Sequence, residues 1–353
     1  VDYIPQDAEQ DVLVLSLLGL LDAGYDIYRL YVDLYSEQVA GYYDDKTKEM
    51  YVVRGEGFTG PERMTYAHEY VHALQDQTYD LENGLKLNNE YCETNTEYCA
   101  AVTALIEGDA TFIEQTWFFR YATDEDHQQV QEFYSNFTSP VYDSAPEYLK
   151  QDFLFPYQQG LEFVQSLYDQ GGLAAIEQAY RLLPQSTEQI LHPEKYPLDL
   201  PEAVPLPNLQ TALGEEWQPI DENVMGEWYT FLILAYGREN SFRLPLSAAR
   251  QAAAGWKGDA YAVYQKTGTD QAVLVFRSRW ETEQDTDEFW NALSDYGKKR
   301  WGRPDVHQNR SLRWNAAAEG AVAVFSHEGD VIWVIAPNPA MLDSVIDTIK
   351  EGR

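Results

Sequence analysis

Two histidines and a glutamate lie close together in the stretch 67–77, AHEYVHALQDQ, at a spacing that suits a metal site. His68 and His72 are four residues apart, so on a helix both imidazoles share one face and can reach one ion. Two ring nitrogens at ~2.0–2.1 Å from one ion is an arrangement that zinc adopts. Glu69, turned by roughly 100° from His68, lies beside such an ion and can accept a proton from water. We therefore expect zinc ligands at His68 and His72 and a general base at Glu69.

A catalytic zinc site needs a third protein ligand, and Glu107 is the best candidate. It lies in the apolar stretch 104–111, ALIEGDAT, where a carboxylate is costly to bury unless a cation compensates it. The next residue, Gly108, allows close approach of another helix or of the metal. We expect one zinc ion held by Glu107 and the two histidines; the alternative is a histidine pair that occurs by chance on a helix surface. Three other acids compete as the third ligand but lie in a polar segment that needs no cation: Glu90, Glu93 and Glu97.

Three further residues could support this chemistry. Hydrolysis of an acyl bond forms an oxyanion that needs a hydrogen-bond donor, and His192 and Tyr157 are the candidates. The alternatives are a helix C-terminal histidine stabilised by the helix dipole for His192, and aromatic packing for Tyr157. Asp76, four residues after the second histidine, could hold the free ring nitrogen of that histidine or be a surface acid.

The chain has two cysteines, Cys92 and Cys99, seven residues apart in the polar sequence YCETNTEYC. A local disulfide is the favoured interpretation and would indicate an oxidising compartment. The alternative is a pair of free thiols. Zinc binding by the pair alone is disfavoured because the spacing is too wide for a zinc knuckle.

Composition indicates a folded and strongly acidic protein. The 353 residues include 44% hydrophobic and 14% aromatic residues, enough for a sizeable core. The net charge of −33 disfavours binding to nucleic acid or to anionic membranes. The longest apolar run, 12–21, has ten residues, whereas a membrane span needs ~20. The chain begins without Met or a basic leader, as expected of a processed or trimmed N-terminus.

The remaining sequence predicts the elements that position these residues. Asp7 is the expected cap of an amphipathic helix over 7–21, and two strands, 38–43 and 49–53, flank a polar turn. Pro61 fits the first helical position of the histidine helix. An apolar stripe on that helix should face the core: Met64, Ala67, Val71 and Leu74. Further helices are expected over 98–119, 155–170 with Pro156 near its start, 186–192 ended by Pro193, and 222–237.

From about residue 245 the pattern changes to apolar runs that predict strands, each pair followed by a helix. The order ββαββα indicates a small unit with an antiparallel sheet. We expect an α+β protein with a mainly helical domain over 1–244, which includes a small β-hairpin, and an accessory domain over 245–353. Trp256 and Asp259 mark either a packed turn or an interaction surface. The expected strands are 259–265, 271–280, 320–326 and 330–337, and the expected helices are 282–300 and 339–351.

Three stretches resemble the gluzincins, the zinc metallopeptidases of the thermolysin clan: 39–53 (VAGYYDDKTKEMYVV), 66–81 (YAHEYVHALQDQTYDL) and ALIEGDAT. The similarity is greatest to secreted or lipid-anchored bacterial members with an HExxH…EGDA pattern. It extends from about residue 35 to about residue 200, where FPYQQG and STEQILHPEKY are also similar to that group. The resemblance implies that residues 1–244 form a zincin-like catalytic domain with a peptide-binding edge strand in the hairpin. It also implies zinc ligands at His68, His72 and Glu107 and a general base at Glu69.

The sequence departs from thermolysin in two places. Thermolysin has an Asp four residues after the ligand Glu, which orients a zinc histidine, and this position is Thr111 here. Asp109, two residues after the ligand, could orient a histidine through a bend at Gly108 or only cap neighbouring backbone. The separation of 35 residues between the second histidine and the ligand Glu exceeds that in thermolysin. The extra length holds the cysteine segment, which could form a rim of the cleft.

The residues and the resemblance together predict zinc-dependent hydrolysis of peptide bonds, with one zinc ion and a peptide or protein substrate, most simply as an endopeptidase. Two alternatives stay open. One is a catalytically silent metal-binding scaffold that works by binding a partner, and the other is a zinc hydrolase that acts on substrates other than peptides. The resemblance, the acidity and the cysteine pair predict a secreted or cell-surface protein.

Overall fold

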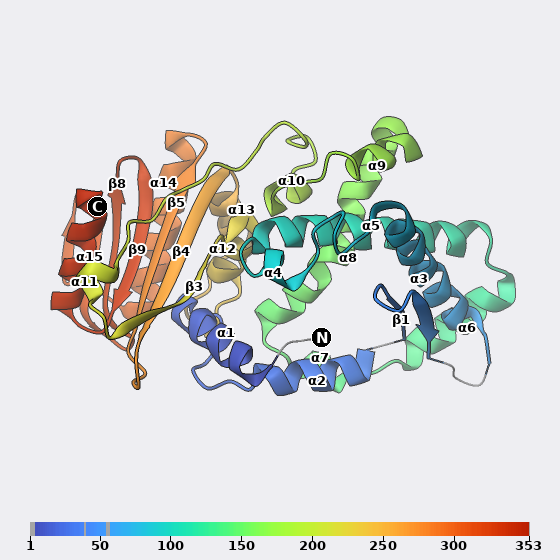
Figure 1. The fold of residues 1–353 in the computed structure, drawn as a ribbon, viewed down its shortest axis with the longest axis horizontal. Coiled ribbons are helices and arrows are strands. Elements are labelled where there is room, and N and C mark those ends of the chain that lie inside the picture. The colour runs from blue at the N-terminus through green and yellow to red at the C-terminus, as the bar shows by residue number, and fades with distance from the viewer. Residues whose placement is uncertain (1–3, 39, 54–56, 353) are drawn as a thin grey trace. The chain divides into compact units, whose positions relative to one another are not determined.

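The chain is α+β and forms two units, one mainly helical and one built around a large sheet (Figure 1). The computed structural model describes residues 4–38, 40–53 and 57–352. The helical unit carries both histidines of the predicted site, and the sheet unit combines three separate parts of the chain. The helical unit contains residues 28–145 and 149–199, and the sheet unit contains residues 1–27, 146–148 and 200–353.

In the helical unit, a two-stranded antiparallel hairpin lies against the histidine helix, with further helices around it. Both predicted strands form, but the first begins at Gly41 and not at residue 38, because Gln38 ends the preceding helix; residue 39 lies outside the described residues. The Asp44 carboxylate closes the turn between the strands by accepting the N–H groups of Lys46 at 2.9 Å and Thr47 at 3.0 Å. The elements are α2 (Ile27–Gln38), β1 (Gly41–Asp44), β2 (Glu49–Val52), α3 (Gly60–Tyr79), α4 (Asn89–Cys92), α5 (Thr96–Arg120), α6 (Asp124–Asn136), α7 (Pro140–Ser144), α8 (Glu147–Gly171), α9 (Leu173–Ala179) and α10 (Thr187–Leu191).

Helix α3 carries the two histidines, and its start follows from local sequence. Thr59 and Glu62 form a capping box, in which the Thr59 N–H donates to the Glu62 carboxylate at 2.9 Å. Pro61 is the second residue of the helix, one position after the predicted first position, and so still lies in the first turn. The prediction that Leu74 faces the core is wrong, because 46% of its surface is exposed. Val71 of the predicted stripe is buried, and three polar side chains share the buried face of the helix: Glu69, Gln75 and Asp76.

Helices α5 and α8 cross at a pair of glycines. A Cβ on Gly108 would lie 2.2 Å from the carbonyl oxygen of Gly160, and a Cβ on Gly160 would lie 2.1 Å from the carbonyl oxygen of Ala104. Only residues without a side chain allow the two backbones to approach this closely. The close approach expected at Gly108 is therefore confirmed, and the element that approaches is a helix.

Prolines mark helix boundaries differently in two helices. Helix α10 ends at Leu191, just before Pro193, as predicted. Helix α8 instead begins at Glu147, earlier than predicted, and continues through Pro156. The residue before this proline, Phe155, is fully buried, so packing of the preceding turns offsets the helix bond that the proline removes.

The two cysteines join α4 to the first turn of α5. A disulfide connects Cys92 and Cys99 with an S–S distance of 2.07 Å, which confirms the predicted pairing. Both helices around it start with asparagine caps. The side chain of Asn88 accepts the N–H of Tyr91 at 3.0 Å, and that of Asn95 accepts the N–H of Tyr98 at 3.2 Å.

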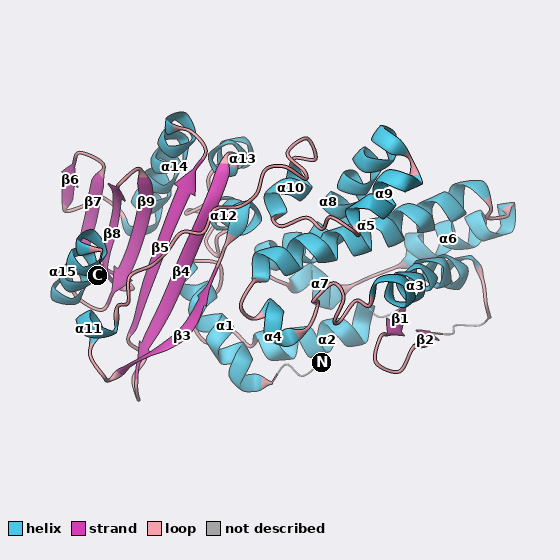
Figure 2. Ribbon diagram, turned by 45° about the horizontal axis from the view of Figure 1, so that its top comes forward, coloured by secondary structure: helices cyan, strands magenta, loops and turns pink. Residues whose placement is uncertain are grey.

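A seven-stranded antiparallel sheet forms the centre of the other unit, in the order β3-β4-β5-β9-β8-β7-β6 (Figure 2). The sequence predicts β4, β5, β8 and β9 but misses three strands toward the two edges. These strands are polar or short, and β3 contains Pro219, which an edge strand tolerates. The elements are α1 (Pro5–Leu18), α11 (Gln210–Leu213), β3 (Trp217–Asn223), α12 (Gly226–Ala235), α13 (Leu246–Ala253), β4 (Trp256–Lys266), β5 (Ala272–Trp280), α14 (Glu283–Trp301), β6 (Val306–Gln308), β7 (Ser311–Ala317), β8 (Gly320–His327), β9 (Asp330–Ala336) and α15 (Pro339–Glu351).

Helices cover both faces of this sheet (Figure 2). Helices α11 and α15 pack on one face, where Leu213 and Val345 join the core of the central strands. Helix α14 packs on the other face, where the rings of Tyr296 and Trp333 are 6.3 Å apart. Coverage of both faces explains why the central strands are apolar runs rather than alternating patterns. Trp256 and Asp259 are both buried, which excludes the predicted interaction surface, but they lie in strand β4 and not in the predicted turn. Trp256 Nε1 donates to the Asp259 carboxylate at 2.7 Å.

Helix α1 packs into the sheet unit through a buried arginine. Arg300 Nη2 donates to the carbonyl oxygens of Leu17 at 2.9 Å and Ser16 at 3.3 Å, which are at the C-terminal end of the helix. Asp7 is not the cap residue, because the N-cap is Ile4; the Asp7 carboxylate accepts the Ile4 N–H at 3.0 Å from the first turn.

The division between the units lies nearer residue 200 than the expected residue 245. Strand β3, which precedes residue 245, pairs along its length with β4 of the sheet. Helix α1 also belongs to the sheet unit, through the contacts of Arg300. The predicted domain 1–244 therefore contains three segments that the structure assigns to the sheet unit: 1–27, 146–148 and 200–244.

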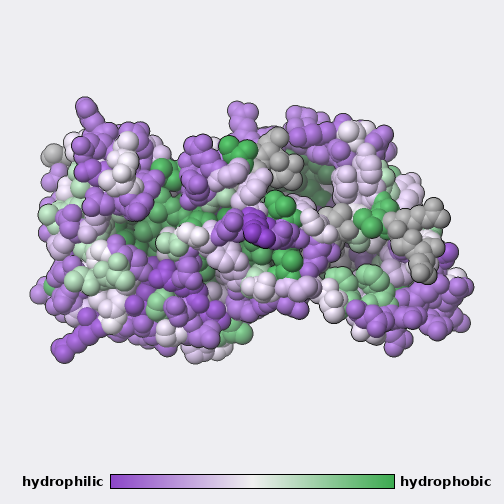
Figure 3. Space-filling view, turned by 90° about the horizontal axis from the view of Figure 1, so that it is seen from below, coloured by the Kyte–Doolittle hydropathy of each residue, from purple (hydrophilic) through white to green (hydrophobic). Residues whose placement is uncertain are grey.

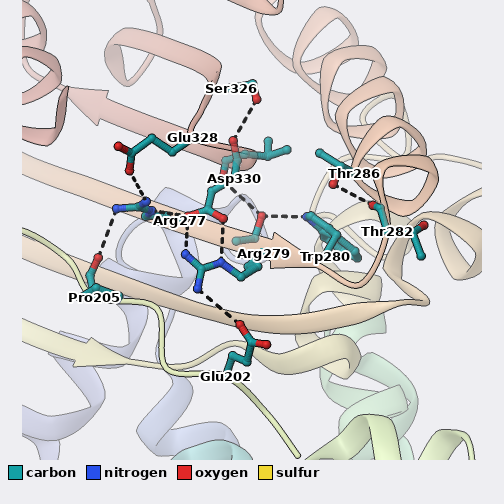
Figure 4. Close-up of polar contacts among 12 residues, drawn as sticks. Glu202, Pro205, Arg277, Arg279, Trp280, Thr282, Thr286, Ser326, Glu328 and Asp330 are labelled. Atoms are coloured by element: carbon teal, nitrogen blue, oxygen red, sulfur yellow. Dashed lines mark hydrogen bonds and ion pairs between the residues drawn. The ribbon is translucent and has the colours of Figure 1, made fainter. Parts of the chain in front are cut away.

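A buried carboxylate at the start of β9 binds two arginines of β5 (Figure 4). Asp330 lies 2.6 Å from Arg277 Nε and 2.9 Å from Arg279 Nε. The outer sides of these arginines contact Glu328 and Glu202, each at 3.5 Å. Burying a carboxylate requires compensation of this kind, so we assign the cluster a structural role.

Hydrophilic residues cover most of the face that Figure 3 shows, and hydrophobic residues gather in smaller patches. This agrees with the net charge of −33. Among the residues that the structure describes, we find no helix that combines the length and the apolar character needed to span a bilayer.

Candidate metal centre

Helices α3 and α5 bring His68, His72 and Glu107 together in the helical unit. Glu107 Oε2 lies 3.1 Å from His68 Nε2 and 3.3 Å from His72 Nε2. One ligand atom from each residue lies within 4.8 Å of the other two. The imidazole rings are 4.8 Å apart and inclined by 77°. The three residues predicted from sequence spacing thus form one cluster.

The chemistry of this cluster fits a zinc ion. Two imidazoles and one carboxylate form a donor set that catalytic zinc uses, and three protein ligands leave one position for water or substrate. Both histidines direct Nε2 toward Glu107 and have a hydrogen-bonding partner at Nδ1. An imidazole held at one nitrogen in this way presents the other nitrogen to a metal in a fixed orientation.

The partners of the two Nδ1 atoms are Glu114 and Gln75, which the sequence analysis missed. His68 Nδ1 lies 2.9 Å from the Glu114 carboxylate, and His72 Nδ1 lies 2.9 Å from the Gln75 side-chain oxygen. Glu114 follows Glu107 by seven residues, and Gln75 follows His72 by three. Both spacings place the pairs on one helix face, and this is the signal that could have identified them.

The histidines and Glu107 shift one another's pKa. Burial alone would lower the pKa of His68, but hydrogen bonds with Glu107 and Glu114 outweigh burial and raise it to about 10. Burial alone would also lower the pKa of His72, but the hydrogen bond with Glu107 outweighs burial and raises it. Burial would raise the pKa of Glu107, but hydrogen bonds from the histidines lower it to about 2. The metal-free centre therefore keeps protons on its imidazoles, and a metal cation has to displace them.

Glu69, the predicted base, faces the hairpin beside the centre. Only 9% of its surface is exposed, and its Oε2 accepts the backbone N–H of Tyr43 in β1 at 2.9 Å. Burial raises the pKa of Glu69, although the positive charge of His72 and His68 opposes this. A carboxyl group with a raised pKa is better matched to proton transfer near neutral pH.

Tyr157 of α8 also lies beside the centre. Its ring centroid is 6.2 Å from that of His68, and 41% of its surface is exposed. Burial of the hydroxyl and the nearby carboxylates of Glu107 and Glu69 raise the pKa of Tyr157, so the hydroxyl keeps its proton. The structure thus places this sequence-predicted residue where it can donate a hydrogen bond toward the centre.

His192 is not part of the group formed by His68, His72 and Glu107. It is the residue at the C-terminal end of α10, and its Nδ1 lies 3.8 Å from the Glu194 carboxylate. Of the competing acids, Glu97 is buried and accepts the N–H of Thr187 at 2.6 Å, which anchors α10 to the first turn of α5. Glu90 and Glu93 are likewise outside the cluster.

Asp76 has a different role from both of its predicted ones. It neither holds His72, which is paired with Gln75, nor lies on the surface. Its Oδ2 accepts hydrogen bonds from the Tyr43 hydroxyl at 2.7 Å and from Lys48 Nζ at 2.6 Å. Asp76 therefore ties the hairpin to α3 and fixes the strand whose N–H reaches the predicted base.

Asp109 supports His72 indirectly, through Gln75. Helix α5 is continuous from Thr96 to Arg120, so Asp109 does not reach a ligand through a break at Gly108. Its Oδ2 instead lies 3.1 Å from Gln75 Nε2 and accepts the Tyr180 hydroxyl at 2.8 Å. Thr111, at the position where thermolysin has Asp, has a buried hydroxyl without a hydrogen-bonding partner in the part of the chain that the structure describes.

Comparison with known proteins gives one match, in the sheet unit. Residues 215–346 match a family model described as "Domain of unknown function (DUF8575)". The chain matches no curated protein and no solved structure. The matched residues run from just before β3 into α15, so they follow the sheet and not the expected boundary at residue 245. Every residue of the candidate metal centre precedes residue 215 and lies outside this match.

Proposed function

We propose that the protein is a zinc-dependent peptidase. The observation that carries the proposal is the convergence of two histidine Nε2 atoms and the Glu107 carboxylate next to a further buried acid, Glu69. Zinc, when bound, supplies a Lewis acid that lowers the pKa of water and polarises a carbonyl group. The resemblance of three stretches to the gluzincins, and with it a zincin-like catalytic domain, supports the same reaction.

In this proposal Glu69 accepts a proton from the attacking water and passes it to the leaving amine. The hydrogen bond from Tyr43 holds the carboxylate in one orientation, and burial favours its protonated form, as a proton shuttle requires. Tyr157 donates a hydrogen bond to the oxyanion that develops on the scissile carbonyl. We assign this role to Tyr157 and not to His192, because Tyr157 lies beside His68 whereas His192 is outside the group formed by His68, His72 and Glu107.

The hairpin offers a surface for an extended peptide. Its sheet has only two strands, β1 and β2, so each has an edge that pairs with no other strand among the described residues. Tyr43 belongs to β1, and its N–H binds Glu69, so this strand runs beside the proposed base. A substrate that pairs with a strand edge forms backbone hydrogen bonds, which favours peptides over other substrates. The Cys92–Cys99 disulfide supports a location in an oxidising compartment, as for a secreted protein.

The variant Glu69→Gln tests the proposal. It should keep one zinc ion per chain and lose at least ~100-fold in peptidase activity, the contribution typical of a general base. Glu132→Gln makes the same change at an exposed position of α6 and should keep both zinc and activity. Metal content by atomic emission and cleavage of a diverse peptide library give the two readouts. Full activity of Glu69→Gln would refute the assignment of Glu69 as the general base. Wild-type protein that binds zinc and cleaves no peptide would favour a binding scaffold or a hydrolase of other substrates.

A further inference from the structure

Gln75 is a buried amide between the two helices that supply the metal ligands. It is 3% exposed, and its Oε1 lies 2.9 Å from His72 Nδ1. Its Nε2 lies 3.1 Å from the Ile106 carbonyl oxygen, 3.1 Å from the Asp109 carboxylate and 2.7 Å from the Tyr180 hydroxyl. We infer that Gln75 is a positioning residue that fixes the tautomer of His72 for metal binding; this inference rests on the proposed zinc site.

The Ile106 carbonyl decides which way the amide faces. A carbonyl oxygen only accepts hydrogen bonds, so the Gln75 atom that faces it must be the amide nitrogen. Turning the amide over would place Oε1 against the Ile106 oxygen and the Asp109 carboxylate, which are both acceptors, with no proton between them. Gln75 Oε1 therefore faces His72.

This orientation determines where the proton of His72 lies. The Gln75 oxygen also only accepts, so His72 Nδ1 must carry a proton and donate it. Neutral imidazole, the form that binds metals, has a single N–H. Once a metal cation has displaced the second proton, His72 Nε2 therefore holds the lone pair, and Nε2 is the atom that lies 3.3 Å from Glu107 Oε2 at the centre.

Two neighbours hold the amide in place. The Asp109 carboxylate accepts both the amide N–H and the Tyr180 hydroxyl, the latter at 2.8 Å. The ring of Tyr180 is fixed in turn by that of Tyr79, which stacks on it at 4.4 Å with planes only 2° apart. Ile106 and Asp109 flank the ligand residue of α5. The helix that supplies the third ligand thus also sets the tautomer of the second histidine, so the two ligands depend on one packing arrangement.

A matched pair of variants tests the role of the amide. Gln75→Met removes the amide but keeps an unbranched side chain of similar length, and Gln77→Met makes the same change on the exposed face of the same helix. We expect Gln75→Met to bind zinc ~10–100-fold more weakly in competition with a chelator, as is typical when a supporting partner of a ligand is lost. Gln77→Met should bind zinc like the wild type. A folded Gln75→Met protein with wild-type zinc affinity would overturn the inference.

Nitrogen NMR of the histidine side chains tests the tautomer directly in the unaltered, zinc-loaded protein. We expect a proton on His72 Nδ1 and the metal on Nε2. Metal on Nδ1, or a bare Nδ1, overturns the inference even if Gln75→Met does not fold. Neither measurement uses peptidase activity. A protein that binds zinc in this way and cleaves no peptide therefore refutes the proposed peptidase and leaves the role of Gln75 standing, whereas a wild-type protein without zinc affinity overturns both.

Discussion

Replacing Gly108 by Ala tests how far the glycine contact between α5 and α8 stabilises the helical unit. The new Cβ would lie 2.2 Å from the Gly160 carbonyl oxygen, whereas ordinary Cβ contacts are 3.4–4 Å. The atom it meets belongs to the backbone and cannot rotate away, so the helices must separate by roughly 1 Å. Overpacking of this kind costs about 3 kcal/mol at the upper end of its usual range. Alanine gains about 1 kcal/mol in helix propensity, which leaves a loss of about 2 kcal/mol in the free energy of unfolding.

The matched control is Gly171→Ala at the end of α8. It brings the same gain in helix propensity, but its Cβ would meet the methyl group of Ala175 at 3.1 Å, which a small shift relieves. Urea unfolding of the metal-free variants, followed by far-ultraviolet circular dichroism, should show Gly108→Ala to be the less stable by about 2–3 kcal/mol. Equal stability of the two variants would refute the reasoning from the glycine contact.

The same variant separates two functions of the helices. Tyr157 lies on α8 and moves when α8 is displaced, whereas the three metal ligands lie on α3 and α5. Peptidase activity of Gly108→Ala should therefore fall more than its zinc affinity. A larger loss of zinc affinity than of activity would indicate that α8 holds the ligands themselves.

Three further predictions concern protons and salt. The pKa of His68 is raised from 6.5 to about 10 in the metal-free protein and that of His72 is also raised, so zinc displaces one or two protons at neutral pH. Each displaced proton changes the zinc affinity about tenfold per pH unit. Competition with a chelator should therefore show zinc affinity rising about 10–100-fold per pH unit near neutrality. A zinc affinity that does not change with pH would contradict this. The raised pKa of His68 stabilises the metal-free fold, and this contribution is complete below pH 6.5 and lost as the pH rises through about 10. Measurements of the free energy of unfolding at several pH values test this. The net charge of −33 predicts that the melting temperature rises with salt as the screening length falls from ~10 Å at 0.1 M to ~3 Å at 1 M; a melting temperature that falls with added salt would count against repulsion as the destabilising force.

The metal ligands could be predicted because their spacing and surroundings are local properties of the sequence. Four residues between histidines and an acid in an apolar stretch are visible without knowing how the helices pack. The partner of His72 could not be predicted in the same way. Gln75 and Asp76 follow it by three and four residues, and both spacings lie on its face of the helix. Which of them reaches the histidine depends on the hairpin, because Tyr43 and Lys48 engage Asp76 and leave Gln75 to face α5.

Prediction of the sheet from the sequence is limited in the same way, because some strands depend on contacts with distant parts of the chain. Its central strands are buried on both faces and therefore appear in the sequence as apolar runs. Strand β3 has exposed polar positions and a proline, so its sequence resembles a loop, and only pairing with β4 makes it a strand. Leu74 on α3 shows the opposite error, because the sequence pattern predicts that it is buried and the structure exposes it. It fits an apolar stripe, but the face of α3 that packs combines Val71 with polar groups of the site, and this cannot be inferred from periodicity.

The contact between Arg300 and helix α1 has a consequence for the order in which the chain folds during synthesis. The hydrogen bond from Arg300 to the Ser16 carbonyl joins residues 284 positions apart, whereas the helical unit closes within residues 28–199. Closing a long loop costs more entropy and delays the contacts that depend on it. The helical unit can therefore fold while the ribosome is still making the sheet. Helix α1, although translated earlier, has to wait for its partner until Arg300 has left the exit tunnel.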